Sequence, residues 1–138
     1  VSLGMAVVEA ANRSFRVHHP ERPEVSSVDV TEFYDEDPLT GMGRGAVIYG
    51  ESHMDRSPCG TGTTAKMTLL HHQGKLKTGD PYQNAGPLGT VFQGRIVKEV
   101  AIGARVGIVG RIRGSAQMTG VHQFVLDTRD PFPEGFLL

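Results

Sequence analysis

The chain has 138 residues, of which 38% are hydrophobic and 21% are charged, and its formal net charge at pH 7 is −1. This length suits one domain with enough chain to bury a hydrophobic core. The balanced charge provides no attraction to nucleic acid or to an anionic membrane surface, and no apolar stretch approaches the ~20 residues of a transmembrane helix. We therefore expect neither a nucleic acid nor a membrane as a partner.

Cys59 is the one cysteine of the chain, so no internal disulfide can form and the fold does not require an oxidising compartment. No basic-then-apolar signal peptide opens the sequence. These features favour a cytoplasmic protein. The chain enters a helical pattern directly after Val1 with no capping residue before it, and we interpret it as the C-terminal piece of a longer protein.

The first half of the sequence predicts one helix and two strands. Residues 2–13 have helical periodicity. The residues expected to share the helix's apolar face are Leu3, Val7, Ala10 and Ala11. Residues 28–33 alternate between apolar and polar, as in a half-buried strand. The acids, proline and glycines of residues 35–44 predict an exposed loop, and residues 45–50 predict a short buried strand.

The second half predicts a helix from about Gly60 to Gln73, followed by strands. Gly74 is suited to end this helix and Lys75 to complement its dipole. Because the helix is apolar over most of its length, we expect a sheet to surround it. The β-rich segments that follow are 90–97, 106–109, 115–119 and 121–126. Several strands around one buried helix predict an α+β fold.

Cys59 immediately precedes the predicted helix, inside the run Asp55–Ala65. A helix N-terminus stabilises a thiolate and can also hold a carboxylate, because its first N–H groups are unpaired and its dipole is positive there. The segment is therefore a candidate for a proton-transfer group beside an anchor for an acid substrate. No set of histidine, cysteine and acidic residues has metal-ligand spacing, so no metal site is expected.

The run Asp55–Ala65 resembles the second cysteine motif of the proline racemase family, which includes proline racemases and hydroxyproline epimerases. The similarity extends to residues 67–76, 89–95, 119–127 and 130–136. It implies a diaminopimelate epimerase-like domain in which a mixed or antiparallel sheet wraps around a central helix. Residues 1–110 would form the C-terminal catalytic domain without its N-terminal portion. Residues 111–138 would cross back to complete the absent first domain.

The resemblance also implies a reaction and roles for four residues. Family members exchange the α-proton of proline or hydroxyproline without a cofactor, using one thiolate base and one thiol acid on opposite faces of the α-carbon. Cys59 would be one of these thiols. The backbone N–H groups of Gly60 and Thr61 would bind the substrate carboxylate, and Asp55 would bind its cationic nitrogen. The expected partners are the imino acid, the upstream half of the protein and a second copy in a homodimer.

Two more modest interpretations compete with these roles. Cys59 could be a small buried hydrophobic residue, and Asp55 could cap a helix. A separate alternative for the whole chain is a non-catalytic binding module, which keeps the anion-binding helix and holds an imino acid or another carboxylate without racemising it.

Overall fold

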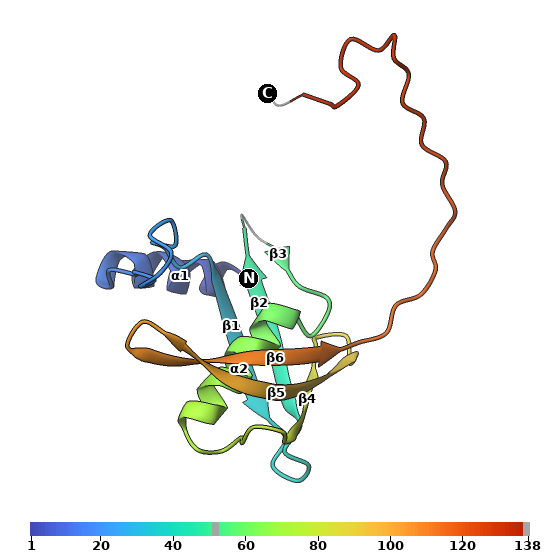
Figure 1. Ribbon diagram of the computed structural model, residues 1–138. Coiled ribbons are helices and arrows are strands. Elements are labelled where there is room, and N and C mark those ends of the chain that lie inside the picture. Colours follow the sequence, from blue (N-terminus) through green and yellow to red (C-terminus); the bar gives the residue numbers. More distant parts are fainter. Residues whose placement is uncertain (51–52, 137–138) are drawn as a thin grey trace.

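The computed structural model of the chain describes residues 1–50 and 53–136. Its elements in chain order are α1 (Ser2–Ser14), β1 (Val30–Glu36), β2 (Gly43–Tyr49), β3 (His53–Met54), α2 (Gly60–His72), β4 (Pro81–Ala85), β5 (Val91–Ile102) and β6 (Arg105–Arg113). These strands form a six-stranded mixed sheet with the order β1-β2-β4-β5-β6, and β3 pairs with β2. β2 and β4 run parallel, whereas the other neighbouring strands run antiparallel (Figure 1).

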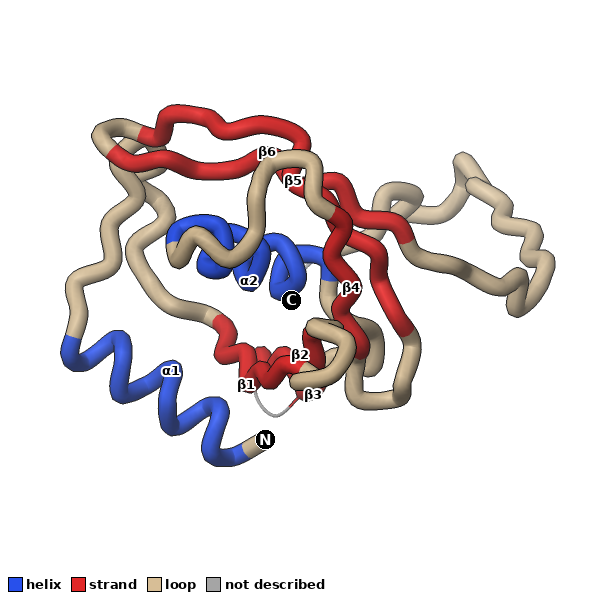
Figure 2. The backbone as a smooth tube through the Cα atoms, turned by 90° about the horizontal axis from the view of Figure 1, so that it is seen from below, coloured by secondary structure: helices blue, strands red, loops and turns tan. Residues whose placement is uncertain are grey.

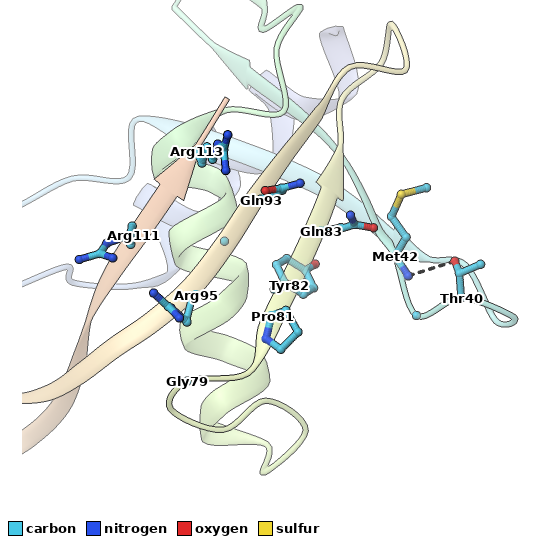
Figure 3. Close-up of a pocket in the computed structure, with 12 residues that line it drawn as sticks. Thr40, Met42, Gly79, Pro81, Tyr82, Gln83, Gln93, Arg95, Arg111 and Arg113 are labelled. Atoms are coloured by element: carbon cyan, nitrogen blue, oxygen red, sulfur yellow. Dashed lines mark hydrogen bonds between the residues drawn. The ribbon is translucent and has the colours of Figure 1, made fainter. Parts of the chain in front are cut away.

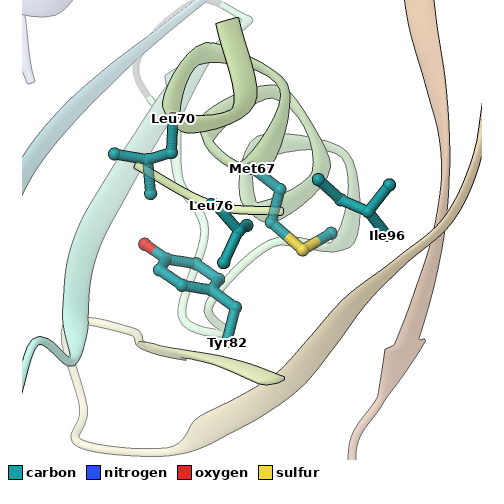
Figure 4. Packing of buried hydrophobic residues seen from close by; sticks show 5 residues of the cluster. All are labelled: Met67, Leu70, Leu76, Tyr82 and Ile96. Carbon is teal, nitrogen blue, oxygen red and sulfur yellow. The ribbon is translucent and has the colours of Figure 1, made fainter. Parts of the chain in front are cut away.

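Helix α2 lies inside the curved sheet, with β1 and β2 on one side and β5 and β6 on the other (Figure 2). Its side chains Met67 and Leu70 pack against Leu76, Tyr82 and Ile96 in the hydrophobic core (Figure 4). Met67 and Ile96 have no exposed surface. The expectation of an α+β fold with a sheet around a central helix is confirmed.

The ends of α2 follow from local capping. The predicted helix from about Gly60 to Gln73 is observed as Gly60–His72, with Gln73 as its C-cap. Gly74 has a φ of +71°, which glycine adopts without steric cost. The Gly74 N–H donates to the His71 carbonyl (2.9 Å) and the Lys75 N–H to the Leu70 carbonyl (2.9 Å). This pair of hydrogen bonds is the Schellman motif, so Gly74 ends the helix as predicted.

The first helix is where the sequence predicts it, but the face that carries Leu3 and Val7 is not the face that it buries in this chain. Gly4 and Val8 are its buried residues, whereas Leu3 and Val7 are 65% and 43% exposed. The reason is a close approach of backbone to sheet: a Cβ on Gly4 would lie 2.8 Å from the Ile48 Cβ. A helical pattern judged only from large apolar residues does not reveal a buried face that has a glycine at its centre.

Strands β1 and β2 extend into the region predicted as a loop. Asp35 and Arg44 are cross-strand partners, and their side chains form an ion pair with 3.6 Å between Oδ2 and Nη2. The connecting loop is therefore residues 37–42 rather than 35–44. Charged residues indicate a loop in sequence, but on an exposed sheet face opposite charges can pair across two strands.

The strands predicted at residues 115–119 and 121–126 are not formed. Residues 114–136 contain no helix or strand and extend away from the body of the fold (Figure 1). Val121 and Phe124 are 90% and 92% exposed. A β-rich sequence forms a strand only where a neighbouring strand provides hydrogen-bond partners, and none lies beside this segment among the described residues. Residues 137–138 of the predicted crossing segment lie outside the described part of the chain.

Two histidines attach the end of α2 to the sheet. The ring nitrogens of His71 lie 2.8 Å from the Leu76 carbonyl oxygen and 2.8 Å from Glu99 Oε1. His72 Nε2 lies 3.0 Å from the Val106 carbonyl oxygen. Both partners of His71 are acceptors, which the doubly protonated ring satisfies best. The Leu76 carbonyl and then the Glu99 carboxylate raise the pKa of His71 above its ordinary value.

This arrangement makes part of the stability dependent on pH. A raised pKa means that the contribution of His71 is fully present below the unfolded histidine pKa of ~6.5 and is lost as pH rises through the folded value. Glu99→Gln removes the carboxylate charge, so we expect it to lower the melting temperature more at pH 6 than at pH 8.5. Thermal unfolding at both pH values measures this, with Glu24→Gln at an exposed position as the control. An equal loss at both pH values would contradict the pairing.

Candidate active site

The segment from Asp55 to the start of α2, which we call the cysteine segment, is held by a series of local hydrogen bonds. The Asp55 N–H donates to the Val47 carbonyl of β2 (2.9 Å), and the Ser57 N–H donates to Asp55 Oδ1 (2.8 Å). The Cys59 N–H then donates to Ser57 Oγ (3.0 Å). Side chains that accept backbone N–H groups in this way fix a turn without regular secondary structure. Asp55 and Cys59 are thus linked through Ser57 in one ordered segment.

Glycine at position 86, just after β4, allows this segment to pack closely on the sheet. A Cβ on Gly86 would lie 2.7 Å from the Pro58 nitrogen and 2.7 Å from the Ser57 carbonyl carbon. Backbone atoms cannot move aside as a flexible side chain can, so a larger residue would displace the residues before Cys59.

Cys59 is the N-cap of α2, and its side chain replaces the usual capping oxygen. Its sulfur accepts the Gly62 N–H at 3.3 Å and lies 3.3 Å from Thr61 Oγ1. Cys59 has a φ of +58° and is the one non-glycine residue with positive φ among those described. Such a backbone costs about 1–3 kcal/mol and persists where surrounding contacts enforce it, often at functional sites. Cys59 as a whole residue is 8% exposed.

Gly60 and Thr61 form the first turn of the helix beside the thiol. The first N–H groups of a helix have no partner within it and can bind an anion. Gly60 is half-buried and Thr61 is exposed. A Cβ at Gly60 would meet no heavy atom within 4 Å, so the space beside this residue is open. The placement of both residues is compatible with carboxylate binding.

Asp55 is not a helix cap, because Cys59 occupies the N-cap position. Its Oδ1 accepts the Ser57 N–H, and the residue is half-buried. The carboxylate therefore belongs to the same turn that positions the cysteine.

Sequence reasoning missed two residues that contact this segment. Thr63, in the first turn of α2, donates its hydroxyl to the Pro58 carbonyl at 3.0 Å. Asn84, in β4, donates its amide to the same carbonyl at 3.2 Å. Both side chains are fully buried. The Asn84 contact joins residues far apart in sequence, and no local pattern could have indicated it.

One cavity on the sheet is separate from Cys59. It has a volume of about 840 Å³ and lies beside β4, β5 and β6, with Arg95, Arg111 and Arg113 in its lining (Figure 3). Neither Cys59 nor Asp55 lines it. In the described part of the chain, the cysteine segment therefore lies outside this cavity.

No cluster of three or more histidine, cysteine or acidic side chains suited to a metal ion occurs among the described residues. In the same residues, no helix is both long and apolar enough to cross a membrane.

The fold is shared with two solved structures, one of a hydroxyproline epimerase and one of a probable proline racemase. One is a hydroxyproline epimerase from Agrobacterium vitis with bound trans-4-OH-L-proline, with a TM-score of 0.82 and 34% identity over 100% of this chain and 40% of that one. Another is a probable proline racemase from Agrobacterium radiobacter K84 with bound carbonate, with a TM-score of 0.82 and 35% identity over the same shares of both chains.

The family model described as Proline racemase matches residues 1–137, and the chain belongs to the proline racemase family. It is 39% identical to the proline racemase of Clostridioides difficile over 99% of this chain and 41% of that protein. It is 38% identical to a probable 4-hydroxyproline 2-epimerase of Rhizobium meliloti over 94% of this chain and 39% of that protein. The chain thus spans about two fifths of the length of these relatives.

The contact between Thr61 and Cys59 predicts how the thiol reacts. A hydroxyl that donates to a thiolate favours the reactive form, and hydrogen bonds to charged groups contribute about 1.5–3 kcal/mol. We expect Thr61→Val to slow alkylation of Cys59 by iodoacetamide several-fold at pH 7. Thr61→Ser keeps the hydroxyl and is the matched control. Equal rates for the wild type and both variants would show that the hydroxyl does not act on the sulfur.

Proposed function

We propose that this chain supplies one of the two thiols of a cofactor-independent racemase or epimerase that acts at the α-carbon of proline or hydroxyproline. The observation that carries the proposal is the position of Cys59, whose sulfur caps α2 and accepts the Gly62 N–H. Relatives named proline racemase and 4-hydroxyproline epimerase support this substrate class.

The chemistry requires a base on one face of the α-carbon and an acid on the other. Thiols have an ordinary pKa of ~8.5, so both the thiol and the thiolate are accessible near neutral pH. Cys59 would remove or return the proton on one face. The second thiol would act from the opposite face and would come from a part of the protein outside these residues. That the chain spans about two fifths of its relatives is consistent with this division.

The substrate would be held by its two charged groups. The N–H groups of Gly60 and Thr61 would donate to the carboxylate and stabilise the negative charge that develops as the proton leaves. Asp55 uses Oδ1 to hold the Ser57 N–H, and its Oδ2 would accept from the cationic nitrogen of the substrate. The three sites lie along one short segment, as a small imino acid requires.

Closure of this site would depend on the rest of the protein. We assign residues 1–110 to a diaminopimelate epimerase-like C-terminal domain. We assign residues 111–138, of which the first three still belong to β6, to a segment that crosses to complete the first domain. The exposed apolar side chains of residues 114–136 support this assignment, since packing on another domain would bury them. A cytoplasmic homodimer is the assembly that we propose for the complete protein.

Replacing the thiol tests the central assignment. In the longer protein that contains this chain, we expect Cys59→Ser to lower the rate of racemisation by about 10²–10⁴-fold, the usual contribution of a positioned acid or base. The melting temperature should change little, because the two side chains are nearly isosteric. Chiral chromatography of L-proline and hydroxyproline reactions measures the rate. A variant that keeps more than a tenth of the wild-type rate would remove Cys59 from the mechanism.

The carboxylate of Asp55 can be tested apart from its structural role. Asp55→Asn retains an oxygen that accepts the Ser57 N–H, so the turn should be preserved while the charge is lost. Removing one member of a desolvated charge pair costs about 2–5 kcal/mol. We expect kcat/KM to fall at least ~30-fold with an unchanged melting temperature, whereas Asp55→Ala should lower both. If Asp55→Asn retains wild-type kinetics, the carboxylate does not bind the substrate.

A further inference from the structure

The two peptide groups that flank Cys59 are held by one residue, Thr63. Its hydroxyl donates to the Pro58 carbonyl at 3.0 Å, and its backbone N–H donates to the Cys59 carbonyl at 2.9 Å. The φ and ψ angles of Cys59 describe the rotation between these two peptide planes. Fixing both planes from one side chain and its own backbone therefore fixes the conformation of Cys59.

Asn84 completes this arrangement from the sheet. Its Nδ2 donates to the Pro58 carbonyl at 3.2 Å and to Thr63 Oγ1 at 3.0 Å. Both acceptors require the amide nitrogen on this side, so the orientation of the Asn84 amide is determined by its partners. Thr63 and Asn84 have no exposed surface.

We propose that Thr63 and Asn84 are positioning residues for Cys59, and we call them the Thr63–Asn84 clamp. The clamp holds the Pro58–Cys59 peptide so that Cys59 keeps its positive φ and its sulfur stays on the Gly62 N–H. Neither residue touches the substrate in this scheme, and both act through the cysteine. The effect of the clamp on catalysis rests on the proposed function, whereas its effect on the conformation of Cys59 does not.

The neighbourhood of Asn84 supports a dedicated role for its amide. Asn84 pairs with Gly43 across the parallel strands β4 and β2, and a Cβ on Gly43 would lie 2.7 Å from Asn84 Oδ1. The glycine thus leaves room for the polar side chain to turn toward Pro58. A buried amide is costly unless it is hydrogen-bonded. The Asn84 Nδ2 group donates to Pro58 and Thr63, whereas its Oδ1 has no hydrogen-bond partner among the described residues.

Three substitutions test the clamp in the 138-residue chain. Thr63→Val removes the hydroxyl with almost no change of shape, Thr63→Ser retains the hydroxyl, and Ile96→Val loosens the core of α2 without touching the segment. The readout is the hydrogen exchange of the Gly62 amide, measured by NMR, because this N–H donates to the sulfur. We expect exchange at least tenfold faster in Thr63→Val and within threefold of wild type in Thr63→Ser and Ile96→Val.

Asn84→Leu provides a second variant of similar volume if Thr63→Val does not fold, and the same acceleration is expected. Unchanged Gly62 exchange in a folded Thr63→Val or Asn84→Leu chain would overturn the proposal. So would an equal acceleration in Ile96→Val, because the effect would then come from general loosening of the core.

The longer protein separates this proposal from the proposed function. We expect Thr63→Val to lower kcat at least tenfold with KM within threefold, and Thr63→Ser to restore kcat. If the wild-type protein does not racemise imino acids but the Gly62 exchange pattern is as expected, the function fails and the clamp stands. If the wild-type protein is active and Thr63→Val matches it in both kcat and Gly62 exchange, the clamp fails and the function stands.

Discussion

Burial of α2 inside the sheet is the constraint on which the cysteine segment depends. Met67 and Leu70 anchor the helix among side chains from β4, β5 and the loop after the helix. A helix held along its length cannot shift its first turn without disturbing that core. The N-terminus of α2, and with it the sulfur of Cys59, therefore has a fixed place relative to β2 and β4. The thiol does not need a cavity of its own to be positioned.

The cysteine segment uses hydrogen bonds where the rest of the domain uses apolar packing. Cys59 adopts a backbone conformation that is unfavourable for a residue with a side chain, and Ser57, Thr63 and Asn84 supply the contacts that enforce it. The polar contacts are local except for that of Asn84. This arrangement suits the acid-base role proposed for Cys59, because Ser57, Thr63 and Asn84 contact the backbone and not the sulfur.

The sequence was sufficient for the parts of the fold that depend on local signals. The bounds of α2 follow from its cap and from Gly74, and the cysteine segment follows from its resemblance to a family motif. Contacts between residues far apart in the chain could not be predicted from the sequence. The buried face of α1 depends on Gly4 approaching Ile48, and β4 contains the polar residues Gln83 and Asn84, which do not indicate a strand. Residues 114–136 have a strand-like composition, but composition does not supply a pairing partner.

The parallel pairing of β2 with β4 has a consequence for the order in which the domain assembles. Parallel neighbours cannot be joined by a tight hairpin, and the connection between these strands runs through the cysteine segment and all of α2. Loop closure over such a distance is slow compared with the formation of the β1–β2 and β5–β6 hairpins. Asn84 reaches Pro58 only when that closure is made. The cysteine therefore acquires its final geometry at the same step at which the two halves of the sheet join, and a chain that has not completed its long-range topology also lacks an ordered thiol.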